Sequence, residues 1–428
     1  MPKPVTRYLE KRSVRGPWTL AGEQRYDFAG AVVIPALAES ADLFATLDSL
    51  AAAVPAGDRQ ALLTVVVINQ PAGSPDHIGI DNRQTLAELP RYAERQPRLP
   101  LTWIDAASPG LELPAEQAGV GLARKLGFDH ALTRLDWQTS EPILISLDAD
   151  TLVSSNYQQG LLDHFQKHRE GGAVIPFRHR PGNCPAQDAA ITYYELFLRS
   201  HVLGLAQAGS PYAFHTVGSA LACRASAYLQ CGGMNQRRAG EDFYFLQQLA
   251  KTVGIVQTKG IEVSPSPRVS RRVLFGTGPS VERHMRGEAD AIRYYPLRSY
   301  QVLHDWLTLT DDRQTSSVEE LLGEADAVNL HLGQFLRNNR ISDIWPKLQR
   351  NNPAPQAFRK AFHTWFDGLK TLRLIHHLCD TECARGSAEQ VLPELLHWAG
   401  LQKTDSPAAQ LELLRQVQNQ GLCPLATL

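Results

Sequence analysis

Two aspartates one residue apart, Asp148 and Asp150, follow directly on the apolar stretch at residues 142–147. Carboxylates at positions i and i+2, on a loop that leaves a strand, can both reach one hard divalent cation. Mg²⁺ or Mn²⁺ bound in this way is shared with substrate phosphates rather than caged by protein ligands alone. The alternative is a turn in which an aspartate caps the following helix. The triplet by itself is compatible with both readings.

A second acidic pair, Glu241 and Asp242, follows Gly240 and precedes an apolar pattern at positions 243, 246 and 250 that predicts a helix. Acidic residues in a first turn stabilise the helix dipole, which is the simplest explanation of the pair. A carboxylate at the mouth of a pocket can also take a proton from a hydroxyl nucleophile as a general base. Capping is the stronger interpretation when the pair is taken in isolation.

Three arginines, Arg268, Arg271 and Arg272, stand beside the glycine-containing turn at 276–278, and His284 follows. Guanidinium groups bind diphosphates through planar bidentate contacts, so Arg271 and Arg272 are candidate phosphate ligands. His284 is a candidate metal ligand or phosphate contact. The alternative is a solvated basic loop.

Two other patterns carry less information. His376, His377, Cys379 and Cys383 lack the second cysteine pair or distant histidine pair of a zinc site. The glycines at 119 and 121 lack the third glycine of a dinucleotide fingerprint and do not directly follow a strand. We therefore expect neither a zinc site nor a nicotinamide site.

The acidic pairs lie within an alternation of short apolar runs and amphipathic segments. Strands are predicted at 31–35, 62–69, 101–106, 142–147 and 171–177, with helices between them, including one at 119–135. Continuous apolar strands that alternate with helices predict a mainly parallel sheet covered on both faces. Ligands of such sheets bind beyond the carboxyl ends of the strands, where Asp148 and Asp150 stand.

The pattern changes near residue 290, beyond which amphipathic helices follow one another with hardly a strand. We predict an N-terminal extension at 1–28, an α/β domain at 29–290 and an α-helical C-terminal region at 291–428. The length of 428 residues agrees with two or three domains.

Composition narrows the class of protein. The formal net charge of −1 gives no reason to expect nucleic acid or an anionic membrane as a partner. No apolar run approaches the length of a transmembrane segment, and the N-terminus has no secretory apolar core. Six scattered cysteines do not suggest a disulfide framework. We expect a cytoplasmic enzyme with reduced thiols.

Taken together and in chain order, these segments resemble the family 2 glycosyltransferases over roughly residues 30–275. The stretches that carry the resemblance are VVIPALAE, LLTVVVIN, GLARKLGFDHA, LISLDAD, TVGSALACRASAYLQCGGMN and GEDFYFLQQL. The resemblance implies the GT-A fold, in which a Rossmann-like nucleotide-binding half is merged with an acceptor-binding half. It also implies a nucleotide-diphosphate sugar as donor and a hydroxyl group as acceptor.

The resemblance assigns roles residue by residue. Asp148 and Asp150 match the metal-binding DXD motif, and Asp242 matches the catalytic base, with Glu241 orienting the acceptor or its neighbour. The residues that it places at the nucleotide sugar or beside the acceptor are Pro35, Glu39, Asn69, Arg124, Lys125, Asp148, Gly218 and Ser219. The segment with Arg271 and Arg272 is not a general motif of the family. From the residue types we assign Arg271 and Arg272 as diphosphate contacts and His284 as a third metal ligand.

The chain also departs from the family pattern. Ala38 replaces an asparagine, Lys125 replaces another, and Asn69 and Gln70 stand where an acidic pair usually binds the nucleotide base, so the base stays open. The Q-x-x-R-W motif of processive synthases is absent after Asp242. A soluble, non-processive enzyme that adds one sugar is therefore expected.

The resemblance implies an inverting displacement assisted by Mg²⁺ or Mn²⁺. A retaining GT-A enzyme of the sugar–glycerate type stays open as an alternative, and so does a GT-A-fold binding protein without activity. A nucleotidyltransferase is less compatible, because residues 32–40 have neither the glycine nor the basic residue of its phosphate loop. The sugar, the acceptor and the oligomeric state are left open.

Overall fold

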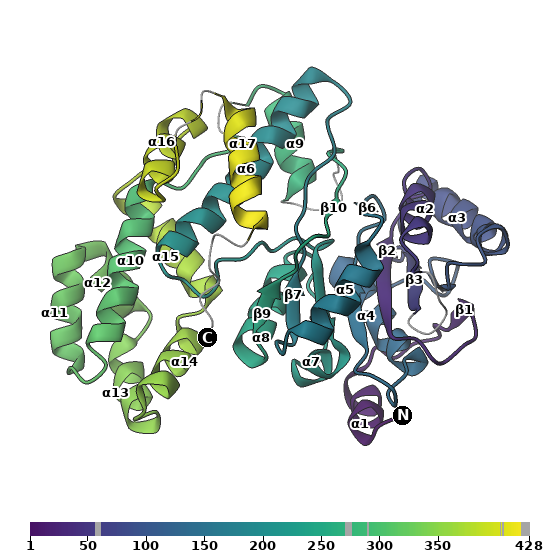
Figure 1. Ribbon diagram of the computed structural model, residues 1–428, viewed down its shortest axis with the longest axis horizontal. Coiled ribbons are helices and arrows are strands. Elements are labelled where there is room, and N and C mark those ends of the chain that lie inside the picture. The colour runs from purple at the N-terminus through teal and green to yellow at the C-terminus, as the bar shows by residue number, and fades with distance from the viewer. Residues whose placement is uncertain (56–60, 270–275, 289–290, 403, 405, 421–428) are drawn as a thin grey trace. The chain divides into compact units, whose positions relative to one another are not determined.

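The computed structural model describes residues 1–55, 61–269, 276–288, 291–402, 404 and 406–420. These residues form two compact units, shown in Figure 1. The first comprises residues 1–180 and 216–266, and the second comprises residues 181–215 and 267–428, apart from the positions outside the described ranges. The predicted domain limits at 28 and 290 stay a prediction.

The first unit is built on an eight-stranded sheet with the order β1-β4-β3-β2-β5-β8-β7-β9. All its strands except β1 and β8 run in one direction. The strands are β1 (Leu20–Gly22), β2 (Gly30–Ala36), β3 (Leu62–Asn69), β4 (Leu101–Ala106), β5 (Ile143–Ser146), β7 (Gly172–Val174), β8 (Leu221–Arg224) and β9 (Ile255–Gln257). A separate antiparallel pair joins β6 (Leu152–Val153) to β10 (Val263–Ser264).

The central strands form because their side chains are apolar on both faces. Every residue of β3 and β5 is buried, and in β2 only Pro35 is partly exposed. The register sets Val33 of β2 between Val65 of β3 and Ser146 of β5. This confirms the predicted α/β class with a mainly parallel sheet.

One helix, α1 (Lys3–Arg12), precedes the strands of this unit, and the others connect them. These connecting helices are α2 (Leu43–Ala52), α3 (Asp76–Arg95), α4 (Val120–Ala131), α5 (Tyr157–Lys167), α7 (Ala225–Gln230) and α8 (Glu241–Thr252). Helix α4 approaches the sheet at Gly127, where an added Cβ atom would lie 2.3 Å from Val33 Cγ1. Glycine is thus required for this close helix–sheet contact.

Residues 1–28, predicted as a polar extension, contain regular structure. Helix α1 buries Val5 and Tyr8, and β1 pairs with the edge of β4. The indole of Trp18 donates a hydrogen bond of 2.7 Å to the main-chain oxygen of Leu111. The N-terminal residues are therefore part of the first compact unit.

In the part of the chain described, the second unit is helical. Its helices are α6 (Pro185–Gln207), α9 (Thr277–Met285), α10 (Leu297–Asp312), α11 (Val318–Val328), α12 (Leu330–Asn338), α13 (Ile341–Asn351), α14 (Pro355–Trp365), α15 (Gly368–Thr381), α16 (Ala388–Trp398) and α17 (Pro407–Asn419). Trp306, Trp345 and Phe362 are among the largest side chains of its core. The predicted helical C-terminal region is confirmed.

A buried ion network joins the first and last helices of this unit. Arg415 of α17 makes two hydrogen bonds of 2.8 Å to the carboxylate of Glu195 in α6. Arg199 forms an ion pair with the same carboxylate and also donates a hydrogen bond of 3.0 Å to the side-chain oxygen of Gln418 in α17. No helix in the described residues combines the length and apolarity needed to cross a bilayer.

Candidate active site

The predicted acidic residues lie at the carboxyl edge of the sheet. Asp148 and Asp150 follow β5, which runs parallel to β2. Strand β8 is antiparallel to β5, with Leu221 opposite Ser146, so Gly218 and Ser219 lie before β8 at this same edge. The hydroxyl of Ser146 donates to the main-chain oxygen of Gly218 at 2.7 Å and ties the two strand ends together.

Arg124 joins the two acidic pairs. It lies in the second turn of α4, its side chain is 3% exposed, and its guanidinium forms ion pairs with Asp148 and Glu241. Desolvation lowers the pKa of Arg124, but the charges of Asp148 and Glu241 outweigh it, and the net pKa is raised. The two carboxylates are thus held on one permanent cation, although 93 residues separate them in sequence (241 − 148).

Gly218 makes room for this arginine. A Cβ atom at position 218 would lie 2.5 Å from Nη2 of Arg124. The neighbouring Ser219 is buried, and its hydroxyl has no hydrogen-bond partner. A buried hydroxyl in this state has unused donor and acceptor capacity at the edge of the site.

Asp242 begins helix α8 together with Glu241, after Gly240 with φ of 70°. Burial, reinforced by the charge of Glu241, raises the pKa of Asp242 to about 7, against a smaller lowering by Arg124. Its Oδ1 accepts a hydrogen bond of 2.7 Å from the main-chain nitrogen of Phe243. A carboxylate of this pKa can exchange a proton near neutral pH.

The donor set after β5 fits a hard cation. The side chain of Asp148 is 38% exposed, and its bond to Arg124 uses Oδ1. The main-chain oxygen of Asp150 accepts a hydrogen bond of 2.9 Å from Arg180, which fixes the loop. Among the described residues, no group of three or more His, Cys, Asp or Glu is arranged around a metal position. Mg²⁺ and Mn²⁺ need only one or two carboxylates when phosphates and waters complete the shell.

The residues predicted beyond the other strands lie at this edge as well. Glu39 is buried after β2, and Asn69 ends β3. The amide of Asn69 donates to the main-chain oxygens of Ala36 at 3.1 Å and Val67 at 3.0 Å. Ala38 adopts φ of 52°, a left-handed conformation that asparagine tolerates better than alanine.

Lys125 is held inside the protein. It is 4% exposed, and its Nζ atom lies 2.7 Å from the hydroxyl of Tyr8 and 3.1 Å from the carboxylate of Asp129. Its predicted contact with a nucleotide sugar would compete with these bonds. Tyr8 and Asp129 were not predicted from the sequence, since 117 residues separate Tyr8 from Lys125.

The remaining predicted ligands belong to the second unit or are not described. His284 belongs to α9 of the helical unit, where its ring centre lies 5.3 Å from that of Tyr193. Its role as a metal ligand stays a prediction. Arg271 and Arg272 lie outside the described residues.

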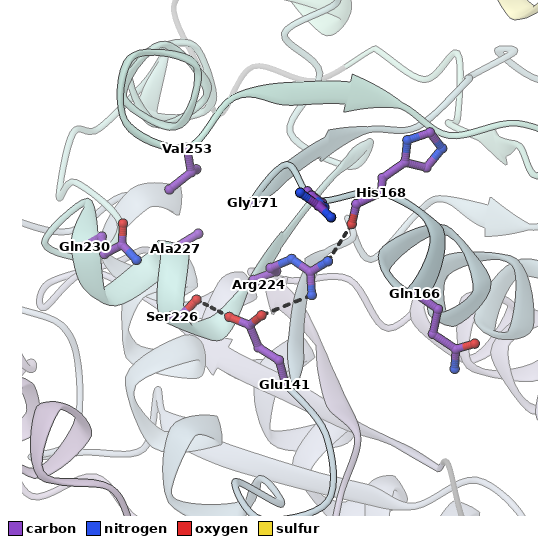
Figure 2. Close-up of a pocket in the computed structure, with 10 residues that line it drawn as sticks. Glu141, Gln166, His168, Gly171, Arg224, Ser226, Ala227, Gln230 and Val253 are labelled. Atoms are coloured by element: carbon purple, nitrogen blue, oxygen red, sulfur yellow. Dashed lines mark hydrogen bonds and ion pairs between the residues drawn. The ribbon is translucent and has the colours of Figure 1, made fainter.

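A pocket of about 470 Å³ lies at the opposite end of β5, lined in part by Glu141 and Arg224. Figure 2 shows the guanidinium of Arg224 held between Glu141, at 3.1 Å, and the main-chain oxygen of His168, at 2.6 Å. Arg224 thus links the segment before β5 to the residue that follows α5. The predicted site residues Asp148 and Asp150 lie at the other end of β5.

No protein-family model matches the chain, and no curated protein matches it. Among solved structures, S. aureus TarS 1–349 is 12% identical with a TM-score of 0.37, over 92% of each chain. The mannosyltransferase PcManGT from Pyrobaculum calidifontis, solved with GDP-Man and Mn²⁺, is 17% identical with a TM-score of 0.38, over 97% of this chain and 94% of that one. At these values neither similarity fixes a family or an activity for this chain.

Proposed function

We propose that the protein is a glycosyltransferase that moves one sugar from a nucleotide-diphosphate sugar to an acceptor hydroxyl. The proposal rests on one observation above all: Arg124 joins the Asp148 carboxylate beyond β5 to Glu241, which directly precedes Asp242. At one edge of the sheet the site thus holds a carboxylate that can bind a divalent cation and a carboxylate that can accept a proton. Such a pair suits a reaction in which a hydroxyl attacks a carbon that carries a diphosphate leaving group. The order of the sequence motifs supports the same reaction.

In the proposed mechanism Asp148 and Asp150 would hold Mg²⁺ or Mn²⁺, which would neutralise the charge that develops on the leaving diphosphate. Asp242 accepts the proton of the acceptor hydroxyl as its oxygen attacks the anomeric carbon, so the configuration inverts. The pKa of about 7 keeps part of the Asp242 population ionised near neutral pH. Glu241 fixes Arg124, which in turn fixes Asp148.

Binding and turnover test different parts of this proposal. Calorimetry against UDP, GDP, ADP, CDP and dTDP, with and without Mn²⁺, should give metal-dependent binding of at least one nucleotide. Asp148→Asn should weaken that binding. Asp242→Asn should keep it and lower sugar transfer by about 100-fold or more, the usual range for loss of a general base. Near wild-type transfer by Asp242→Asn would disprove the role of Asp242 as the base.

The inverting course has its own test. The anomeric configuration of the product, determined by NMR, should be opposite to that of the donor sugar. Retention of configuration would favour the sugar–glycerate type of enzyme and would leave the metal and donor assignments in place.

A binding protein without catalytic activity is the second candidate. It is supported by the internal bonds of Asn69 and Lys125, two positions that the resemblance places at the nucleotide sugar. Absence of binding to every nucleotide and nucleotide sugar at millimolar concentration with Mn²⁺ would favour the form of this candidate in which the fold serves only as a scaffold.

A further inference from the structure

A buried polar cluster connects the N-terminal helix to the helix that carries Arg124. The carboxylate of Asp129, in α4, accepts hydrogen bonds from Tyr8 at 2.9 Å, from Tyr228 at 2.8 Å and from the main-chain nitrogen of Val14 at 2.9 Å. Lys125 adds an ion pair of 3.1 Å. Four groups therefore donate to this carboxylate. Of the five residues in the cluster, only Lys125 was predicted to contact the substrate.

The contacts of Tyr8 leave little free space. Its ring centre lies 5.7 Å from that of Tyr228, and Nζ of Lys125 lies 5.1 Å from its ring centre. A Cβ atom at Gly233, which has φ of 86°, would lie 1.9 Å from the Tyr8 hydroxyl. The main chain at Gly233 is therefore in direct contact with the tyrosine.

This cluster lies against α4, which carries Arg124, and against the segment at 228–242, which carries Glu241 and Asp242. Lys125 is the next residue after Arg124, and Asp129 lies one turn further along α4. Tyr228 and Gly233 begin the segment that reaches Glu241 and Asp242. Farther along, Gly121 of α4 packs against this segment, since its added Cβ would lie 2.5 Å from the Arg237 oxygen and 3.0 Å from Glu241 Cβ. Helix α4 and the 228–242 segment thus meet at two places, of which one is the tyrosine cluster.

We propose that Tyr8 is a positioning residue for the active site: its hydroxyl, through Asp129 and Lys125, sets α4 against the 228–242 segment and so aligns Arg124 with Glu241. The inference rests on the proposed function and assigns a role to the N-terminal residues 3–14. In this role the N-terminal residues stabilise the position of Arg124 relative to Glu241 and are not themselves substrate contacts. Burial and the adjacent Asp129 raise the pKa of Tyr8, so the hydroxyl stays a donor at physiological pH.

The test compares two tyrosines that each donate one hydrogen bond to an aspartate. Tyr8→Phe removes the bond to Asp129 and also the bond of 2.7 Å that the Tyr8 hydroxyl accepts from Lys125. Tyr92→Phe is the matched control, because Tyr92 donates a bond of 2.8 Å to Asp48 in the same unit and contacts Phe44 of α2. Tyr228→Phe removes the second hydroxyl at Asp129 and tests the cluster from α7, should Tyr8→Phe fail to fold.

Two measurements on the full chain separate positioning from simple stability. Hydrogen exchange should become faster in residues 120–131 and 231–242 together in Tyr8→Phe, and in neither segment in Tyr92→Phe. Calorimetry with Mn²⁺ and the nucleoside diphosphate that the wild type binds should show an affinity weaker by about fivefold or more for Tyr8→Phe, as expected when the two hydrogen bonds of its hydroxyl are lost. Tyr92→Phe should bind as the wild type does, although its melting temperature also falls.

Each outcome decides a different statement. Unchanged exchange in the two segments, or faster exchange with unchanged affinity, would overturn the positioning role of Tyr8. If the wild type bound no nucleoside diphosphate with Mn²⁺, the proposed function would fail, while the exchange data would still decide whether Tyr8 braces α4 against the 228–242 segment.

Discussion

The guanidinium of Arg124 holds two carboxylates in positions that neither would keep alone. Glu241 is 4% exposed and Asp148 is 38% exposed, so the arginine is the partner on which the buried acid depends most. A buried carboxylate that loses its cation keeps the cost of desolvation without the compensating attraction. Loss of the arginine would therefore lower the stability of the protein as well as disturb the geometry of the site.

Replacing Arg124 by methionine should destabilise the protein strongly. We expect the free energy of unfolding to fall by about 3 kcal/mol, because Glu241 is left buried and unpaired. Urea denaturation at pH 7 measures the change. Arg91→Met is the control, since the side chain of Arg91 is 72% exposed and its replacement should change stability by less than about 0.5 kcal/mol. Equal effects of the two changes would contradict the interpretation.

The raised pKa of Asp242 makes stability depend on pH. Between pH 4 and 7 the folded protein keeps a proton that the unfolded chain releases, so the folded state loses stability as pH rises through this window. Asp242→Asn removes the titration. We expect the free energy of unfolding of this variant, relative to that of the wild type, to rise by on the order of 1–2 kcal/mol from pH 4 to pH 8.

Urea denaturation of both proteins in chelator at each pH isolates this effect, because every other titrating group is common to the two. A stability difference that stays constant with pH, or that falls as pH rises, would contradict the raised pKa.

The residue types of the site were predictable, but their partners were not. Asp148 and Asp150 follow a continuous apolar run, and Glu241 and Asp242 precede an amphipathic helix, which are local patterns. The bonds of Lys125 to Tyr8 and of Arg124 to Glu241 each span 117 residues. Sequence spacing carries no signal for such pairs, so Lys125 was assigned to the ligand although its ammonium group is bonded within the protein.

At the level of elements, α4 can lie close to the sheet because Gly127 has no side chain. An added Cβ atom would lie 2.3 Å from Val33 and 2.9 Å from Val67. We expect Gly127→Ala to lower the free energy of unfolding by about 1–3 kcal/mol through overpacking, despite the better helix propensity of alanine.

A second helical glycine provides a control of opposite sign. Apart from its chain neighbours and the backbone of its own helix, no atom of the described residues lies within 4 Å of a Cβ added at Gly323 of α11. Gly323→Ala should therefore raise stability by up to about 1 kcal/mol. Thermal unfolding of both variants tests the pair of expectations, and a stabilising effect of Gly127→Ala would show that α4 can move away from the sheet.

The elements differ in how far the sequence determines them. The strands β2, β3, β4 and β5 are mostly buried, mostly apolar and four to eight residues long, and all were predicted. Helix α1 was not predicted, because only Val5 and Tyr8 of its ten residues are buried. Strand β1 escaped for a similar reason: it has three residues, of which two are exposed.

At the scale of the whole molecule, the helical unit is closed by the bonds of its last helix. Arg415 is 14% exposed and Glu195 is fully buried. Arg415→Met should raise hydrogen exchange in α6 and α17 by an amount that corresponds to about 1.5–3 kcal/mol, the contribution of hydrogen bonds to a charged group.

The pair of Arg337 and Asp326 provides the comparison, because the side chain of Arg337 is 48% exposed. Arg337→Met should change exchange by less than about 0.5 kcal/mol. A larger effect at Arg337 than at Arg415 would contradict the role given to the buried network.

The path of the chain through the sheet also bears on how the protein is made. Strand β7 pairs only with β8 and β9 among the described strands, yet residues 181–215, which belong to the other unit, are synthesised between β7 and β8. A nascent chain that ends at residue 215 can form the β1-β4-β3-β2-β5 part of the sheet, but β5 then has an open edge. Open edges pair readily with other chains, so a nascent chain that ends before β8 exposes at β5 an edge that the complete protein covers.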